Sequence, residues 1–182
     1  MLFSPTSIPE VIEITPKIFK DSRGEFLEVY RSAEFAEAGI NLEFVQDNHA
    51  GSYQGVLRGL HYQIQQAQGK LVRVISGEIY DVAVDLRKGS TTFGLAVGMQ
   101  LSDQKKNQLW IPPGFAHGYY VISDWAEVSY KVTEYYASEH ERTLLWNDPQ
   151  LKINWPLISK IHPLLSENDL QGHLLSEAET YE

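Results

Sequence analysis

Three residues between Gly55 and Lys70 have side chains that could act together on an anionic substrate. The segment GVLRGLHYQIQQAQGK contains Arg58, His61 and Lys70, in a chain with a formal net charge of -9. Arginine and lysine carry positive charge, and an imidazole titrates close enough to neutral pH to accept a proton. The segment therefore predicts a local anion pocket with a base beside it. The alternative interpretation is a surface strand that carries scattered basic residues.

The elements that position these side chains follow a period of two, interrupted by Gly, Pro and Asn or Asp. Residues 20–24 are predicted to be the turn of an N-terminal hairpin. Residues 32–38 are the one clear early helix, which Ser32 can cap and Gly39 can end. Many short strands at this spacing are typical of a sandwich, jelly roll or barrel. The other strands are expected at 11–15, 44–49, 56–63, 71–76, 78–86, 95–101, 108–111, 118–122 and 127–136, and the strand pattern fades after 139.

Alternation along these strands leaves two questions open. Under strict alternation, Arg58 and His61 lie on opposite faces of their strand, and a bulge at Gly59 would turn one of them. Tyr130 lies on the apolar face of its strand, either as a core residue with a satisfied hydroxyl or as an acid in a cavity. Asp81 shares a face with other short or acidic side chains, which predicts a polar interior there.

Composition limits the classes of protein to which the chain can belong. Its 182 residues fit one domain, so we expect a single domain over residues 1–182, with 140–182 as a C-terminal wrapping segment. The acidic balance opposes nucleic-acid binding, because a net anionic surface repels phosphates. The absence of cysteine removes disulfides and thiolate chemistry. Neither a signal peptide nor a membrane-spanning run is recognisable, so we expect a cytoplasmic protein that does not enter membranes.

A metal site is not expected. The stretch PGFAH that ends at His117 resembles the second motif of the metal-binding cupins, whose first motif needs His-x-His and a nearby Glu. Here His61 is the single histidine at the corresponding place. Two imidazoles from separate strands are too few ligands for a firm transition-metal site. We therefore expect no metal and no other cofactor.

Eight segments, in order over nearly the whole chain, match the pattern of one family. They are DSRGEFLE at 21–28, FVQDNH at 44–49, GVLRGLHYQ at 55–63, QGKLVRV at 68–74, GEIYDVAVDLR at 77–87, LWIPPGFAHG at 109–118, YK at 130–131 and WNDP at 146–149. On these segments the chain resembles the dTDP-4-dehydrorhamnose 3,5-epimerases, metal-free relatives of the cupins. The resemblance implies an all-β, cupin-like jelly-roll β-barrel with a short N-terminal helix and short C-terminal helices, paired as a homodimer.

The resemblance also implies an activity and a set of catalytic residues. The family inverts C3 and C5 of dTDP-4-dehydro-6-deoxy-D-glucose, two carbons that flank a ketone and therefore carry weakly acidic protons. Enolisation needs a base, an acid across the ring and a cation at the carbonyl oxygen. The resemblance assigns these roles to His61, Tyr130 and Lys70, with Asp169 orienting the base. Without the resemblance, Lys70 would be interpreted as a solvated lysine after a turn and Asp169 as part of a helix start.

Further positions match residues that bind the dTDP-sugar in the family. Arg23 and Arg58 fit the diphosphate, because a guanidinium can hold phosphate oxygens in a bidentate manner. In the family, the hairpin that carries Arg23 reaches the partner subunit's site. One departure is Asn168, where many members have a lysine that contacts substrate; asparagine keeps a donor but loses the charge. The other matching positions are Glu28, Gln46, Asn48, His117 and Glu141.

Three other functions remain open from the sequence. A 3,4-ketoisomerase of dTDP-sugars has a similar barrel and also enolises its substrate, but the Arg-Gly-Leu-His block and the positions of Tyr130 and Lys70 favour the epimerase. A mono-epimerase is hard to separate from a double epimerase, although Tyr130 favours inversion at both carbons. A sugar-nucleotide binding module is the non-enzyme alternative, and it has no need of both a base and an acid.

Overall fold

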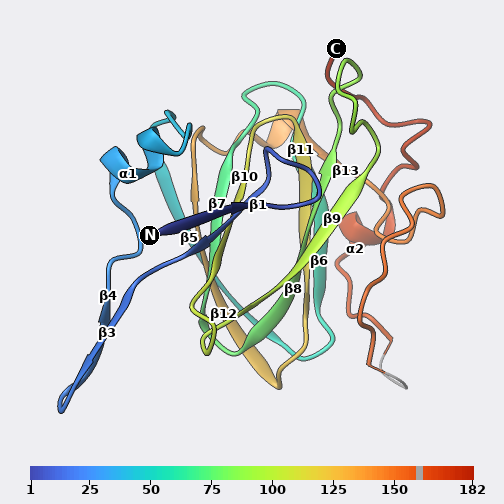
Figure 1. Cartoon of the computed structure of the whole chain (residues 1–182). Coiled ribbons are helices and arrows are strands. Elements are labelled where there is room, and N and C mark those ends of the chain that lie inside the picture. Colours follow the sequence, from blue (N-terminus) through green and yellow to red (C-terminus); the bar gives the residue numbers. More distant parts are fainter. Residues whose placement is uncertain (159–161) are drawn as a thin grey trace.

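Two antiparallel sheets face each other and form a barrel in the computed structural model, which describes residues 1–158 and 162–182 (Figure 1). The strand order is β1-β2-β10-β7-β12-β5 in one sheet and β13-β6-β11-β8-β9 in the other, and β3-β4 form a separate hairpin. The all-β jelly-roll barrel expected from the sequence is confirmed. The strands are β1 (Leu2–Pro5), β2 (Ile12–Thr15), β3 (Ile18–Asp21), β4 (Gly24–Leu27), β5 (Gln46–Tyr53), β6 (Leu57–Gln63), β7 (Lys70–Ser76), β8 (Glu78–Asp85), β9 (Ala96–Ser102), β10 (Gln108–Ile111), β11 (Phe115–Val121), β12 (Trp125–Val132) and β13 (Glu141–Thr143).

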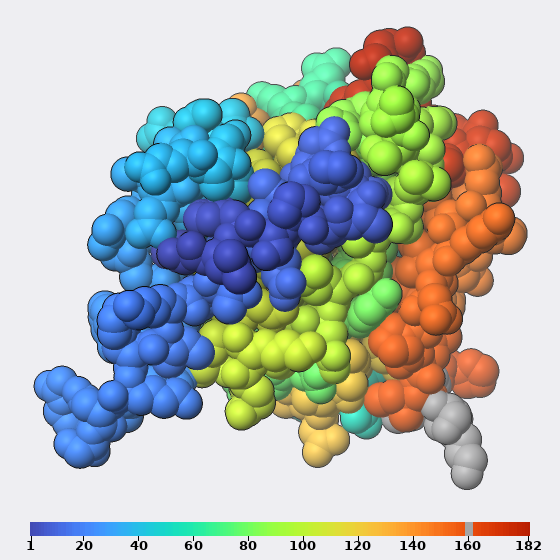
Figure 2. Space-filling model, in the orientation of Figure 1, coloured from blue at the N-terminus to red at the C-terminus, as the bar shows by residue number. Residues whose placement is uncertain are grey.

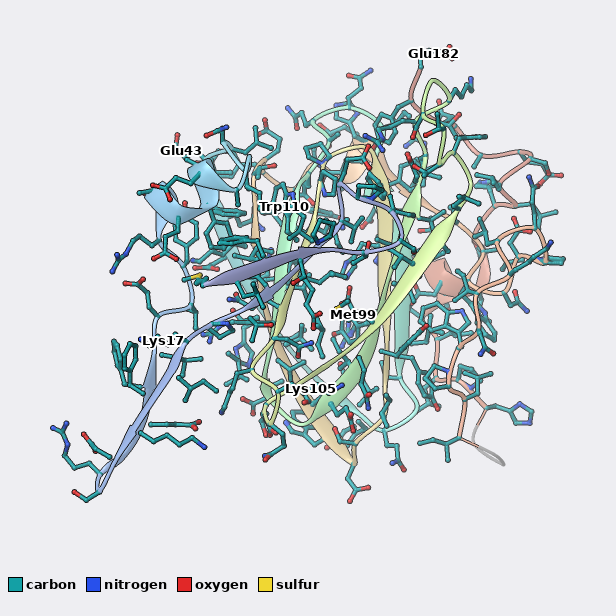
Figure 3. The ribbon with its side chains drawn as sticks, in the orientation of Figure 1. Lys17, Glu43, Met99, Lys105, Trp110 and Glu182 are labelled. Carbon is teal, nitrogen blue, oxygen red and sulfur yellow. The ribbon has the colours of Figure 1, made fainter. Side chains whose placement is uncertain are left out.

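Apolar side chains fill the space between the two sheets, as Figure 3 shows. Val72 of β7, Ala83 of β8 and Val128 of β12 are fully buried there, and Met99 of β9 packs against them. Tyr130 also packs against this inner cluster. The polar site described below is therefore set into a barrel whose lining is otherwise apolar.

The outer face of the five-stranded sheet is buried as well. Val82 and Val84 of β8 point outward and pack with Leu144, Leu151 and other residues of the C-terminal segment. A strand that is covered on both faces usually has an almost continuous apolar sequence, and the segment VAV in β8 is an example. The outward faces of β10 and β7 are covered by the N-terminal helix α1 (Ser32–Glu37), through Phe35.

The C-terminal segment runs along the outside of the five-stranded sheet (Figure 1). Single β-bridges fasten it to the barrel at Val56–Leu164, Arg87–Tyr181 and Leu144–His173. Among its described residues is one short α-helix, α2 (Glu167–Leu170), and a 3-10 turn at Ser138–His140 precedes it. Three positions of the predicted wrapping segment, 159–161, lie outside the described residues. No helix in the described part of the chain is long and apolar enough to cross a membrane.

Several local predictions were wrong. The first helix is not capped by Ser32, because Ser32 is already helical; the N-cap is Arg31, whose side chain makes no capping hydrogen bond and instead pairs with Glu28. Gly39 does follow the helix, with a φ of 87° that suits glycine. Strands β1 and β13 were missed, because each is very short and gains its pairing from a neighbouring strand.

The β3–β4 hairpin projects away from the barrel (Figure 2). The predicted turn at its tip is confirmed, since Asp21 pairs with Gly24 across it. The tip is exposed: the Arg23 side chain is 88% accessible and its guanidinium pairs with Asp21. Phe26 is 68% exposed, an unusual position for a large apolar side chain.

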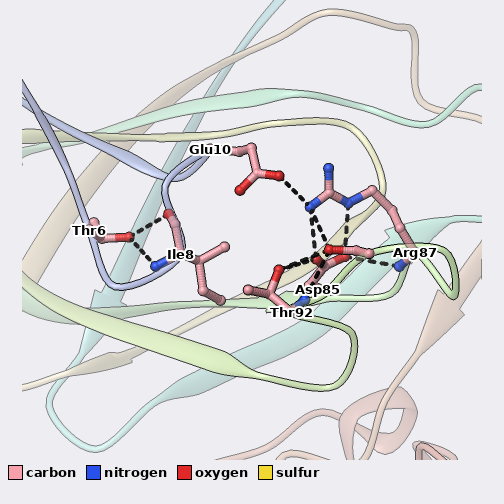
Figure 4. A network of polar contacts seen from close by, with 7 residues as sticks. Thr6, Ile8, Glu10, Asp85, Arg87 and Thr92 are labelled. Atoms are coloured by element: carbon pink, nitrogen blue, oxygen red, sulfur yellow. Dashed lines mark hydrogen bonds and ion pairs between the residues drawn. The ribbon is translucent and has the colours of Figure 1, made fainter.

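A polar network around Asp85 closes the C-terminal end of β8 (Figure 4). The carboxylate of Asp85 is fully buried and accepts hydrogen bonds from Arg87 Nε at 2.9 Å and Thr92 Oγ1 at 2.6 Å. Arg87 also reaches Glu10, at 3.1 Å, and thereby connects the N-terminal segment to this end of the barrel. Although burial acts against it, hydrogen bonding lowers the pKa of Asp85 to about 2.

Candidate active site

A pocket of about 250 Å³ opens at one end of the barrel between the two sheets. Strands β5, β6, β7, β12 and β13 each contribute to it, so residues far apart in the sequence meet there. Its walls are mainly polar, which distinguishes it from the apolar barrel lining. The lining residues are Gln46, Asn48, His61, Tyr62, Gln63, Gln68, Lys70, Tyr130, Tyr136 and Glu141.

A bulge in β6 places Arg58 and His61 on the same side of the sheet. His61 pairs with His117 of β11, whereas Arg58 pairs with Tyr119, so three residue steps on β6 match two steps on β11. Leu57 and Leu60, the residues before each of them, both pack in the outer cluster. Arg58 and His61 therefore both face the barrel interior, and the open question about this strand is answered by the bulge.

Two glycines make this bulge possible. Gly59 has a φ of 119°, a conformation that other residues rarely adopt. A side chain at Gly59 would also lie 2.5 Å from the Cα atom of Gly118 on the neighbouring strand. The close approach of these two glycines therefore sets where His61 points.

His61 is held by Asp169. Its Nε2 lies 2.6 Å from Oδ1 of Asp169, which comes from the C-terminal helix α2. The imidazole is 33% exposed at the pocket wall, whereas the carboxylate is 3% exposed. A proton on Nε2 that is shared with Asp169 leaves the lone pair of the ring on Nδ1, where it can accept another proton.

Asp169 has two structural roles at once. It is the third residue of a capping box at the start of α2: Ser166 Oγ donates to Asp169 Oδ2 at 2.7 Å and accepts from the Asp169 backbone N–H. The backbone N–H of Gly59 donates to Oδ1 at 3.1 Å. Burial acts to raise the pKa of Asp169, but hydrogen bonds from His61, Ser166 and Gly59 outweigh it and lower the pKa. The carboxylate is therefore ionised and fixed in position.

Lys70 lies at the inner end of the pocket and is 7% exposed. Its Nζ donates to the backbone carbonyl of His61 at 3.3 Å. Burial lowers the pKa of Lys70 to about 8, and the charges of Asp81 and Glu141 limit the decrease. An ammonium group so poorly solvated is well suited to stabilise negative charge on a bound molecule.

Tyr130 of β12 faces His61 across the same pocket. Burial raises the pKa of Tyr130, with Arg58 acting against the rise and Glu141 adding to it. The phenol is therefore a neutral proton donor over the physiological pH range.

A second His–Asp pair lies deeper in the barrel. Nε2 of His117 is 2.9 and 3.0 Å from the two carboxylate oxygens of Asp81, and the His117 side chain is 8% exposed. Burial lowers the pKa of His117, and the nearby Lys70 and His61 add to this effect against the attraction of Asp81. The ring is therefore neutral and donates one hydrogen bond to Asp81.

The structure places the predicted sugar-nucleotide residues in three regions. Gln46, Asn48 and Glu141 line the pocket itself. Arg58 lies on the interior face, where its Nε donates to Ser52 Oγ at 3.1 Å. Asn168 lines a neighbouring hollow of about 300 Å³ that shares Glu141 with the pocket.

Arg23 and Glu28 are not brought to this pocket within the chain. Arg23 is at the tip of the projecting hairpin, and Glu28 lies at its base, where it pairs with Arg31. Both side chains line hollows formed by the hairpin and its surroundings.

Sequence reasoning missed several residues of the site. Asp81 was recognised only as one of several polar residues on one face of β8, although an inward carboxylate on a buried strand is itself a signal. Ser166, which fixes Asp169, was seen only as a helix start. Tyr136 sits at the pocket mouth and donates from its hydroxyl to Glu141 at 3.0 Å, an arrangement that depends on a loop and has no periodic pattern.

Within residues 1–158 and 162–182, no three His, Asp or Glu side chains are grouped as metal ligands. Each of the two inward imidazoles uses its Nε2 in a contact with a carboxylate. The absence of a cofactor stays a prediction.

Comparisons with known proteins agree on one family. Residues 5–177 match the family model described as dTDP-4-dehydrorhamnose 3,5-epimerase. The enzyme of that name from Pseudomonas aeruginosa is 57% identical over 176 residues, which cover 96% of each chain.

Solved structures give the same result. The dTDP-6-deoxy-D-glucose-3,5-epimerase of Legionella pneumophila, in complex with dTDP-4-keto-L-rhamnose, superposes with a TM-score of 0.94 at 50% identity, covering 98% of this chain and 94% of that one. A 3'-monoepimerase from Streptomyces bikiniensis, in complex with dTDP-quinovose, has a TM-score of 0.87 at 32% identity, covering 95% of this chain and 87% of that one. The chain belongs to the dTDP-4-dehydrorhamnose 3,5-epimerase family.

Proposed function

We propose that this protein converts dTDP-4-dehydro-6-deoxy-D-glucose to dTDP-4-dehydro-L-rhamnose by inverting C3 and C5, as a step of dTDP-rhamnose biosynthesis. One observation carries the proposal: a histidine paired with a buried carboxylate, a buried lysine and a neutral tyrosine line one pocket. The double inversion requires these groups, because each carbon must lose a proton and regain one on the opposite face. The family named above supports the same substrate.

The base is His61, which removes a proton from the carbon next to the ketone through Nδ1. The electron pair left by that proton moves onto the carbonyl oxygen and makes an enolate. Asp169 stabilises the imidazolium that forms, because its ionised carboxylate lies 2.6 Å from Nε2. Lys70 stabilises the enolate oxygen with its ammonium group.

The acid is Tyr130, which returns a proton to the carbon from the opposite face. The raised pKa of this buried phenol keeps its proton available at neutral pH. The imidazolium of His61 releases its proton to solvent, the phenolate of Tyr130 regains one from solvent, and the cycle repeats at the second carbon. Inversion results because the proton leaves on one side of the ring and arrives on the other.

We also propose that two copies of the chain assemble, each completing the other's site. The exposed hairpin carries Arg23 with an 88% accessible side chain and Phe26 with 68% exposure, and a partner surface would cover both. Arg23 and Glu28 then bind the nucleotide of the neighbouring subunit, together with Arg58 of that site. The expected setting of the enzyme is the cytoplasm.

Two alternatives use the same fold. A mono-epimerase shares the fold, but the TM-score is 0.87 to the 3'-monoepimerase and 0.94 to the 3,5-epimerase of Legionella pneumophila. A 3,4-ketoisomerase shares the enolisation, but the Arg-Gly-Leu-His block and the positions of Tyr130 and Lys70 favour the epimerase. A binding module would need neither the fixed His61–Asp169 pair nor the buried Lys70.

Proton exchange in heavy water tests the proposal. The protein is incubated with dTDP-4-dehydro-6-deoxy-D-glucose in D2O, and NMR reports the deuterium at each sugar carbon. Deuterium at both C3 and C5 supports the double epimerase, and deuterium at one carbon indicates a mono-epimerase. Binding without exchange contradicts the proposal.

A chelator control and a dimer control accompany this experiment. EDTA is expected to leave the exchange rate unchanged, and a rate that falls and is restored by added metal would contradict the metal-free mechanism.

Light scattering is expected to show a dimer. Mixing Arg23→Ala subunits with His61→Ala subunits is then expected to restore part of the activity, since mixed dimers contain one site with both residues intact.

A further inference from the structure

Asp81 is a fully buried carboxylate beneath the pocket. It lies on β8, on the face that points into the barrel with Ala83. Within the described residues, its hydrogen-bonded partner is Nε2 of His117, which both of its oxygens approach. A buried carboxylate with only a neutral imidazole as partner is costly, because no bonded cation compensates its charge.

Lys70 is a buried cation near this carboxylate: its Nζ lies 3.3 Å from the backbone carbonyl of His61, and the partner of His61 on β11 is His117, which contacts Asp81. Among the groups that raise the pKa of Lys70, Asp81 acts most strongly and Glu141 second. The Lys70 ammonium donates to a backbone carbonyl, and no carboxylate is in direct contact with it among the described residues. Its charged form therefore depends on carboxylates that act through space in a dry interior, where Coulomb interactions are strong.

The other carboxylates around Lys70 contribute less to holding its charge. Glu141 is partly exposed at the pocket mouth, where solvent weakens its effect. The Asp169 carboxylate is engaged by His61 and Ser166. The titratable and charged side chains that face Lys70 from the elements around it are Arg58 and His61 of β6, Asp81 of β8, His117 of β11, Tyr130 of β12, Glu141 of β13 and Asp169 of α2.

We propose that Asp81 is a positioning residue for the reaction: its carboxylate keeps Lys70 in the ammonium form and fixes the tautomer of His117. With the proton of His117 on Nε2, toward Asp81, the lone pair on Nδ1 is an acceptor for a substrate hydroxyl or for the Lys70 ammonium. One buried carboxylate thus prepares Lys70, which lines the pocket, and His117, which lies deeper in the barrel, without touching the substrate. This inference rests on the proposed function only for its kinetic consequence.

The titration of Lys70 tests the proposal directly. The protein is labelled with lysine carrying 13C at Cε, and the Lys70 signal is identified by its absence in Lys70→Met. In Asp81→Asn, which keeps the shape and can still accept from His117, the pKa of Lys70 is expected to fall by about one unit or more, as for the loss of an opposite charge nearby. The alkaline fall in the exchange rate moves to lower pH by the same amount.

A second buried carboxylate on the same strand is the matched control. Asp85 is also fully buried on β8, but its carboxylate pairs with the guanidinium of Arg87 and lies outside the pocket lining. Asp85→Asn is expected to lower the melting temperature and to leave the Lys70 titration unchanged. If Asp81→Asn does not fold, Asp81→Ser, whose smaller side chain leaves room for water, is measured in the same way.

Two results would overturn the inference. An unchanged Lys70 titration in a folded Asp81 variant means that other groups hold the ammonium charge. An equal decrease in Asp85→Asn means that the effect is a general loss of packing. The Lys70 titration is measured without substrate, so its result holds even if the heavy-water experiment shows a different reaction. A lowered Lys70 pKa together with an unchanged pH profile of the exchange rate would contradict the proposed mechanism instead.

Discussion

The barrel holds two His–Asp pairs that differ in where their carboxylates come from. His61 is paired with Asp169 from the C-terminal helix α2, and His117 is paired with Asp81 from a neighbouring barrel strand. The first imidazole is 33% exposed at the pocket wall and the second is 8% exposed. The same pair of residue types therefore occurs in one partly exposed and one buried setting.

The difference in exposure suits the two His–Asp pairs to different tasks. A base must release and accept protons, so it needs access to substrate and solvent, together with a partner that tolerates the charged imidazole. The inner pair lies next to Lys70, which disfavours a second positive charge on His117. The outer pair is thus suited to proton transfer, and the inner pair to holding a fixed hydrogen-bond pattern.

Exchanging each histidine for glutamine is the strongest test of this comparison. In His61→Gln we expect the exchange rate to fall by about 10³-fold, because general-base catalysis contributes on the order of 10²–10⁴. Binding of dTDP, measured by calorimetry, stays within a few-fold. In His117→Gln we expect about a tenfold loss that is seen mainly in KM. Equal losses in kcat for the two variants would contradict the division of tasks.

Replacing the outer carboxylate sharpens the role of the first pair. In Asp169→Asn the contact with His61 can form, but the charge that stabilises the imidazolium is gone. We expect kcat to fall by about 10²-fold with little change in KM. A variant with wild-type kcat would show that Asp169 only caps its helix.

The pH dependence separates Lys70 from the histidines. The pKa of Lys70 is lowered to about 8, so the ammonium is present below that pH and is lost as pH rises through it. We expect kcat/KM to fall as pH increases above about 8, tenfold per unit in the limit. Exchange measured from pH 6 to pH 10 checks this, and a rate that stays flat up to pH 10 would remove Lys70 from the mechanism.

The smallest effect is expected at the capping serine. Ser166→Ala removes the hydrogen bond to Asp169 Oδ2 and the helix cap, which together cost about 1 kcal/mol. We expect the melting temperature to fall by about 2–4 °C and the rate by a few-fold. Thermal unfolding and exchange are measured on the same sample, and a rate loss without any change in melting would show that orientation alone is affected.

The barrel strands were largely predictable, because alternation and turn residues are local signals. The site was not, since periodicity alone placed Arg58 and His61 on opposite faces. The bulge at Gly59 reverses that result through a contact with Gly118, a residue far along the chain. The roles assigned to Lys70 and Asp169 came from the family resemblance. The local sequence around Asp169 predicts a helix start, and in the structure Asp169 belongs to a helix start and also contacts His61.

The pairing of His61 with Asp169 spans 108 residues of chain. During synthesis, the barrel strands leave the ribosome before α2, so His61 gains its carboxylate partner only after nearly the whole chain has been made. Catalytic competence therefore arises late, when the C-terminal segment docks. A chain that lacks α2 lacks the carboxylate that orients His61, so turnover reports on the docking of the C-terminal segment.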